Sequence, residues 1–237
     1  MLTSISRMNY RHIFFDLDHT IWDFDKNAEE TLHELYSLYK LQDIGLPSPA
    51  VFIETYTRNN HQLWAAYHTG KITKDELRES RFRKTFIELG VRPDALPIGF
   101  EDDYVQLCPT KTNLFPHAHE TLKYLDSKYT LHLISNGFKE STQMKVDNTS
   151  IGGYFRHIII SETVGINKPD KAIYEHALSM AGAKKCESVM IGDSLEADVY
   201  GAMNFGIDAI YFNPLNLPKP VDVPLQIHHL KELTLLL

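Results

Sequence analysis

The stretch HIFFDLDHTIWDF, residues 12–24, decides the fold that we expect for this chain. It opens on an apolar run, Ile13 to Phe15, which is typical of a buried β-strand. Two carboxylates, Asp16 and Asp18, follow where that strand ends. Burying a charged group costs free energy unless the group is paired or used. The stretch therefore predicts a buried strand whose carboxyl end carries a functional acidic loop.

Apolar runs of strand length recur later in the chain and alternate there with helix-like segments. Such alternation predicts a parallel sheet with helices on both faces. We therefore expect an α/β fold with a doubly wound, Rossmann-like core. The expected strands are 11–16, 129–135, 157–161, 188–193 and 208–212, and the expected helices are 117–127, 139–148, 170–181 and 196–205.

The segment between the first two strands indicates helices only. Thr73 and Glu76 have the spacing of a capping box, and Gly70 and Gly90 are typical helix ends. We expect an all-helical domain at 25–110, inserted into a core made of 1–24 and 111–237. Its first helix is expected to bury the face formed by Leu32, Leu35, Leu38 and Tyr39.

Composition limits the possible classes of protein. The 237 residues carry a net charge of −7, and the Lys and Arg side chains are scattered, which argues against a nucleic-acid polymer as partner. Two cysteines in no metal-like spacing are typical of a reducing compartment. No run approaches the length of a membrane span, and the N-terminus has no signal-like segment, so we expect a cytoplasmic protein. We expect residues 1–7 to be disordered at their tip.

Polar residues follow four of the expected strands. In open α/β sheets, ligands bind outside the carboxyl ends of the strands, so these groups should converge. Taken singly, each has an ordinary explanation: an N-cap, a turn, a solvated lysine or an exposed helix residue. Chance placement of all of them at this edge is improbable. The groups are Asp16 and Asp18, Ser135–Asn136–Gly137, Lys168, and Asp193 with Asp198.

These motifs resemble those of the haloacid dehalogenase-like (HAD) hydrolase superfamily. The matching stretches are DLDHT (16–20), SNG (135–137), Lys168 within NKPD, and GDSLEAD (192–198). The helical insertion is similar to the cap domain of that superfamily. The stretches DLDHTIWDF, LWAAYHTGKITKDELRESRF and ISNGF look like the nucleoside 5′-monophosphate phosphatases of the superfamily that act on pyrimidine and non-canonical substrates.

The resemblance implies a Mg²⁺-dependent phosphatase that acts on a small phosphorylated metabolite through an aspartyl-phosphate. It implies that Asp16 is the nucleophile and Asp18 the general acid and base. Mg²⁺ would be held by Asp16, Asp193 and the backbone carbonyl of Asp18. It further implies phosphate contacts from Lys168, from Ser135 and from backbone N–H groups near Asn136 and Gly137. Asp198 would act as a second-shell or water-mediated ligand.

Aromatic and arginine side chains of the cap are candidates for substrate selection. Aromatic faces stack on bases, and Arg recognises anions. Packing inside the cap is the competing explanation for residues at this helical spacing. The principal candidates are Trp64, Tyr67 and Arg81, and His61, Arg78, Trp22 and Phe24 are further ones.

Other activities remain open at this point. A phosphosugar phosphatase or a phosphomutase would use the same residues. A haloacid dehalogenase is disfavoured by Asp18, because a halide leaving group needs no proton. An inert relative that kept the fold should have lost at least one of these groups. The oligomeric state is left open.

Overall fold

The computed structural model describes residues 9–237, which fall into two compact units. One unit comprises the chain up to Asp23 together with Asn113–Leu237, and the other comprises Phe24–Thr112. The expectation for residues 1–7 lies outside the described residues.

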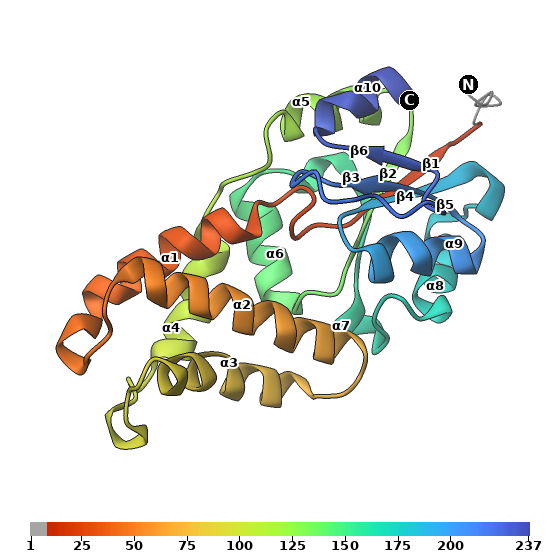
Figure 1. Cartoon of the computed structure of the whole chain (residues 1–237). Coiled ribbons are helices and arrows are strands. Elements are labelled where there is room, and N and C mark those ends of the chain that lie inside the picture. Colours follow the sequence, from red (N-terminus) through yellow and green to blue (C-terminus); the bar gives the residue numbers. More distant parts are fainter. Residues whose placement is uncertain (1–8) are drawn as a thin grey trace. The chain divides into compact units, whose positions relative to one another are not determined.

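The first unit is built on a parallel sheet in the order β3-β2-β1-β4-β5-β6 (Figure 1). The chain winds from β1 towards β3, then returns to β4 on the other side of β1. The topological switch point therefore lies between β1 and β4, where open α/β sheets bind ligands. This confirms the expected fold class. The strands are β1 (His12–Phe15), β2 (Thr130–Ser135), β3 (Phe155–Ile160), β4 (Ser188–Gly192), β5 (Asp208–Phe212) and β6 (Leu225–Ile227).

Helices cover both faces of this sheet. In Figure 1, α8 and α9 lie on one face, and α5 and α10 lie on the other. The buried cluster under α8 and α9 includes Phe14, Tyr174 and Met190, which come from β1, α8 and β4. The helices are α5 (Ala118–Asp126), α6 (Lys139–Asn148), α7 (Ser161–Val164), α8 (Lys171–Ala181), α9 (Gly201–Phe205) and α10 (Leu233–Leu236).

Several elements of the first unit differ from the sequence expectation, among them the short helices α7 and α10, which were not predicted. The edge strand β6 was not predicted, because its three residues are too short to form a recognisable pattern. The helix expected over 196–205 starts instead as a π-helical turn, Leu195–Tyr200, before α9. Ser194 caps this turn by accepting a hydrogen bond from Ala197 N–H at 3.1 Å.

The second unit consists of helices around an aromatic core. Thr73 and Glu76 form the predicted capping box: each side chain accepts a hydrogen bond from the other residue's backbone N–H. Leu38, expected in the core, is 68% exposed, because α1 ends there; Tyr36 is buried instead. The helices are α1 (Phe24–Leu38), α2 (Pro49–His68), α3 (Lys74–Glu88) and α4 (Phe100–Leu107), and the core rings are those of Phe52, Tyr56, Phe82, Phe86, Phe100 and Tyr104.

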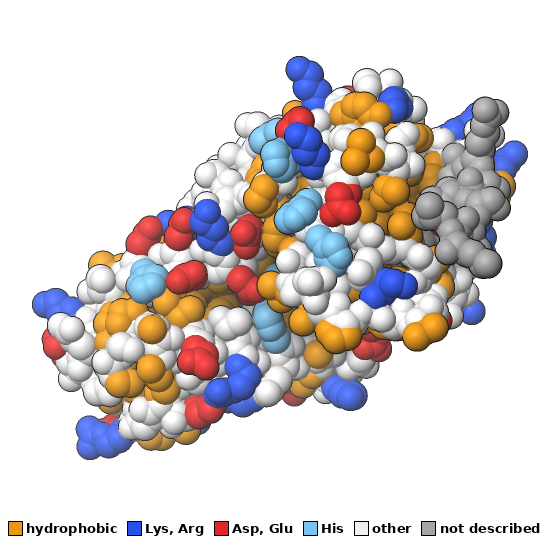
Figure 2. Space-filling view, turned by 45° about the horizontal axis from the view of Figure 1, so that its top comes forward, with side chains coloured by type: hydrophobic (Ala, Val, Ile, Leu, Met, Phe, Trp, Pro, Cys, Tyr) orange, Lys and Arg blue, Asp and Glu red, His pale blue; other side chains and the backbone are white. Residues whose placement is uncertain are grey.

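The charged surface is mixed. On the face shown in Figure 2, Lys and Arg side chains lie singly among acidic and histidine side chains. A nucleic-acid duplex finds no continuous basic stripe on that face. None of the helices within residues 9–237 combines the length and apolarity that a membrane crossing requires.

Three histidines stack across β1, β2 and β3. The ring of His132 lies 5.4 Å from that of His12 and 5.4 Å from that of His157. Burial lowers the pKa of His132 to about 4, and repulsion from the two neighbouring imidazoles adds to the effect. The folded protein therefore keeps His132 neutral at pH values where the unfolded chain protonates it.

We expect this arrangement to make the protein acid-sensitive. Because folding lowers the pKa of His132, the stability that this group contributes is complete above pH ~6.5 and is lost as pH falls towards 4. The loss amounts to about 2 kcal/mol at pH 5. Urea unfolding at pH 7.5 and pH 5 should show a smaller acid loss in His132→Phe than in the wild type. His176→Phe, at an exposed position on α8, is the matched control. Equal acid losses in all three proteins would contradict the expectation.

Candidate active site

Three carboxylates meet at the carboxyl ends of β1 and β4. Asp16 follows β1, and its backbone N–H donates to Ile191 O of β4 at 2.9 Å. Asp193 follows β4, and Asp198 lies in the π-helical turn. One carboxylate oxygen of each lies within 4.8 Å of those of the other two. The sheet topology thus brings together acids that are far apart in sequence.

Lys168 lies at the centre of this cluster and is buried. Its Nζ donates to Asp16 Oδ1 at 2.6 Å, to Asp198 Oδ1 at 2.7 Å and to the backbone oxygen of Ile134 at 2.8 Å. Burial by itself lowers the pKa of Lys168, but attraction to Asp16 and Asp198 outweighs burial and raises the pKa above its usual value. Lys168 is therefore a fixed positive charge beside Asp16.

Asn136 holds the backbone of Lys168. Its Oδ1 accepts from Lys168 N–H at 2.8 Å, and its Nδ2 donates to Lys168 O at 2.9 Å. The side chain of Asn136 is therefore used in this pairing, whereas the phosphate contact expected at Asn136 involves the backbone N–H group. Only its backbone N–H is left as a candidate phosphate donor.

The carboxylates are crowded. Burial raises the pKa of Asp16 to about 7; Lys168 opposes this rise, and the nearby Asp198 charge adds to it. Burial, then the charges of Asp16 and Asp198, also raise the pKa of Asp193 well above its usual value. A bound cation would relieve this repulsion.

The donor set fits a Mg²⁺ ion. Carboxylate oxygens are the hard ligands that Mg²⁺ prefers, and it usually binds through one or two of them. Counting Asp18 and its partner Lys145, four carboxylates face two ammonium groups here. The net charge of about −2 that remains would be balanced by one divalent cation.

The end of β4 is shaped by Gly192, by Ser194 and by the hydroxyl group of Thr20. Thr20 Oγ1 donates to Asp193 Oδ1 at 3.2 Å and accepts from Asp193 N–H at 3.1 Å. Gly192 passes so close to Asp198 that a Cβ there would collide with its carboxyl group. Asp198 Oδ2 also accepts from Ser194 N–H at 3.0 Å. These contacts fix both acids on the strand end.

Asp18 is held separately from this cluster. Its Oδ1 accepts from Lys145 Nζ of α6 at 2.6 Å, and its side chain stays 23% exposed. Its Oδ2 lies opposite the turn after β2: a Cβ on Gly137 would be 3.5 Å from it. In that turn, Gly137 N–H donates to Ser135 Oγ at 3.0 Å. Asp18 and Ser135 therefore face the same space.

The family profile of haloacid dehalogenase-like hydrolases matches residues 10–206, which include every group described above. The chain belongs to the haloacid dehalogenase-like hydrolase family.

Named relatives of this HAD-like hydrolase extend over most of its length. It is 32% identical over 212 residues to pyrimidine 5′-nucleotidase PynA of Streptococcus pneumoniae, covering 89% of this chain and 86% of PynA. It is 29% identical over 214 residues to pyrimidine 5′-nucleotidase YjjG of Escherichia coli, covering 90% of each chain. A crystal structure of the HAD-hydrolase YfnB of Bacillus subtilis, described as bound to magnesium, superposes with a TM-score of 0.84 at 27% identity, covering 96% of this chain and 98% of that one.

The cap candidates occupy different environments within the helical unit. Trp64 and Tyr67 are half-buried near the end of α2, with their rings edge to face at 5.5 Å. Arg81 is buried in the cap interior, where its Nε donates to Glu101 Oε2 at 3.1 Å and its guanidinium lies over the Tyr104 ring. The expectation that Arg81 contacts substrate must therefore be corrected, because its charge is already neutralised inside the cap.

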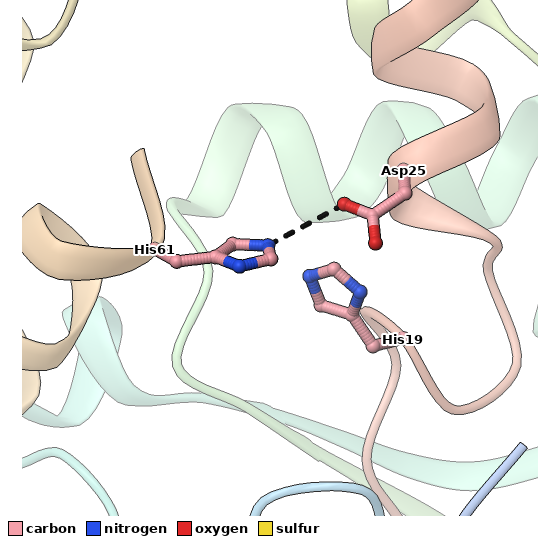
Figure 3. A group of neighbouring side chains, drawn as sticks. All are labelled: His19, Asp25 and His61. Atoms are coloured by element: carbon pink, nitrogen blue, oxygen red, sulfur yellow. Dashed lines mark ion pairs between the residues drawn. The ribbon is translucent and has the colours of Figure 1, made fainter. Parts of the chain in front are cut away.

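The secondary candidates divide in the same way. Arg78 is ion-paired with Glu101 and Asp102. His61 pairs with Asp25 of the same unit at 3.4 Å, the contact marked by the dashed line in Figure 3. Trp22 in the HAD-like core is fully buried, which contradicts the expectation that it lines a substrate pocket. Phe24 is nearly buried.

Sequence reasoning missed Lys145. This residue shares the inward face of α6 with Thr142 and Val146. A lysine on the buried face of a helix was the only available signal, since its partner lies 127 residues away.

Proposed function

We propose that the protein is a Mg²⁺-dependent phosphatase of small phosphate monoesters, and that its substrates are nucleoside 5′-monophosphates. The observation that carries this proposal is the separation of two acids on one loop. Asp16 is buried against Lys168, whereas Asp18 is partly exposed and held by Lys145. A nucleophile and a general acid need these different settings.

In the proposed first step, an oxygen of Asp16 attacks phosphorus. A P–O bond forms to the carboxylate while the P–O bond to the alcohol breaks. The leaving alkoxide takes the proton of Asp18, so the alcohol departs neutral. Lys168, Ser135 Oγ and the backbone N–H of Asn136 stabilise the charge on the phosphoryl oxygens.

In the second step, Asp18 removes a proton from water, which attacks the phosphorus of the aspartyl-phosphate. The bond to Asp16 breaks, and inorganic phosphate is released. One side chain serves both steps because the second proton transfer is the reverse of the first.

The cation site belongs to the same proposal. Asp16, Asp193 and the backbone carbonyl of Asp18 would hold Mg²⁺, with Asp198 acting through water. When bound, Mg²⁺ offsets the repulsion between the Asp16 carboxylate and a phosphate dianion. The clustered acids and the magnesium-bound YfnB structure support this assignment.

The substrate class is supported by relatives. Two of them, from Streptococcus pneumoniae and Escherichia coli, carry the name pyrimidine 5′-nucleotidase and align over about nine-tenths of this chain. We therefore propose a preference for pyrimidine nucleoside 5′-monophosphates. Asp18 argues against haloacid dehalogenation, and a phosphomutase would require an aspartyl-phosphate that outlives the first alcohol.

Phosphate release with Mg²⁺ tests the proposal on a panel of purine, pyrimidine and deoxy nucleoside 5′-monophosphates, sugar phosphates and 4-nitrophenyl phosphate. We expect the highest kcat/KM on pyrimidine monophosphates and loss of activity with EDTA, restored by added Mg²⁺. A preference for sugar phosphates would overturn the nucleotide assignment. Release from none of these esters would overturn the phosphatase proposal itself.

A further inference from the structure

Lys145 is a buried charge on the HAD-like core whose position needs an explanation. Its side chain is 6% exposed, although it extends from the last turns of α6. A lysine is seldom buried unless it is paired, because removing an ammonium from water is costly. The partner here is Asp18 Oδ1, at 2.6 Å. Lys145 is thus buried in contact with the carboxylate of Asp18.

A second contact fixes the direction of this ammonium. Nζ of Lys145 lies 4.3 Å from the centre of the Trp22 ring, within the range of a cation–π interaction. Trp22 is fully buried and belongs to the same loop as Asp18, with which its backbone forms a bridge. The ring and the carboxylate therefore hold Lys145 between them, and the loop is tied to α6.

The two lysines divide the acids of the loop between them. Lys168 binds Asp16 and Asp198, and Lys145 binds Asp18. Asp18 Oδ2 is left near the turn at Gly137, beside Ser135. Without Lys145, nothing in this set of contacts would keep the Asp18 side chain on that side of the loop.

We infer that Lys145 is a positioning residue, which holds the Asp18 carboxyl group where it can protonate the leaving oxygen of the ester. This inference rests on the proposed phosphatase function. Proton transfer depends on placement, and a displacement of about 1 Å can cost up to ~100-fold in rate. Lys145 itself touches neither phosphorus nor the leaving group in this scheme.

The leaving group provides a readout that a purely structural role would not move. An alkoxide from a nucleoside needs the proton of Asp18, whereas 4-nitrophenolate is stable enough to leave without it. The ratio kcat/KM reports the steps up to departure of the leaving group, so it isolates this proton transfer from the later attack by water.

The experiment compares Lys145→Met and Lys145→Arg with wild type on a nucleoside 5′-monophosphate and on 4-nitrophenyl phosphate, both with Mg²⁺. We expect Lys145→Met to lower kcat/KM about 10- to 100-fold on the nucleotide and less than about threefold on the aryl ester. Lys145→Arg should recover part of the nucleotide activity. Asp18→Asn removes the proton donor itself and therefore gives the largest loss of kcat/KM that is selective for the nucleotide. Lys139→Met, at an exposed position on α6, is the matched control.

Equal losses on both esters, or no loss on either, would overturn the inference. Circular dichroism and thermal melting verify that each variant folds; if Lys145→Met does not fold, Lys145→Gln replaces it in the same comparison. Wild type that releases phosphate from neither ester would overturn the proposed function instead, so the two failures are distinguishable.

Discussion

Replacing Asp16 by Asn is expected to lower the rate of phosphate release about 10⁴-fold or more. The amide has nearly the same shape as the carboxylate but is no nucleophile, so the aspartyl-phosphate cannot form. Lys168 keeps its contacts with Asp198 and with the backbone of Ile134, so the local structure should persist. Single-turnover phosphate release from the best ester of the panel measures the loss.

The melting temperature of Asp16→Asn shows whether the loss of activity comes from unfolding. The pKa of Asp16 is raised to about 7, mainly by burial, so ionising this carboxyl group is less favourable in the folded protein than in the unfolded chain. The unfolded chain holds this group ionised at pH 8, and its burial as a charge therefore costs stability there. Asp16→Asn should melt at the same temperature as wild type or higher at pH 8 in EDTA. Asp126→Asn, at an exposed position on α5, should leave activity unchanged. Activity above about 1% in Asp16→Asn would contradict the nucleophile assignment.

Replacing Lys168 by Met is expected to lower the free energy of unfolding by about 3–5 kcal/mol, because one partner of a buried ion-pair network is removed. Asp16 and Asp198 would then face each other without the ammonium that separates them, and Ile134 O would lose its donor. Activity should be lost as well, since the phosphate loses its nearest fixed positive charge. Urea unfolding at pH 8 in EDTA measures the stability change.

The sign of the pH dependence distinguishes charge crowding from poor packing in this variant. Without Lys168, the pKa of Asp16 should rise further, so the deficit should shrink as pH falls and this carboxylate takes up a proton. The double variant Lys168→Met with Asp198→Asn should recover part of the stability at pH 8. Lys171→Met, at an exposed position on α8, is the matched control. A deficit that is independent of pH would contradict this explanation.

Much of the fold and of the site could be predicted from the sequence because the signals are local. The apolar runs predicted five of the six strands in the described residues to within about two residues at either end. Because parallel strands present their carboxyl ends at one edge, the order of the motifs was enough to bring Asp16, Ser135, Lys168 and Asp193 together. The capping box at Thr73 was also readable, since both partners lie within one turn of helix.

Tertiary structure decided how the polar side chains are used. Asp18 and Lys145 are 127 residues apart, and no local period reports that α6 turns a lysine towards this loop. The side chain of Asn136 serves the backbone of Lys168 and Arg81 serves Glu101, although both residue types also bind phosphate. Trp22, on the same loop as Asp18, is buried against Lys145. The sequence by itself determined which chemical groups reach the sheet edge, because local patterns show which residues follow each strand. Only long-range packing decided which partner each group takes, because a buried charge must be neutralised by whatever the fold brings within hydrogen-bond distance.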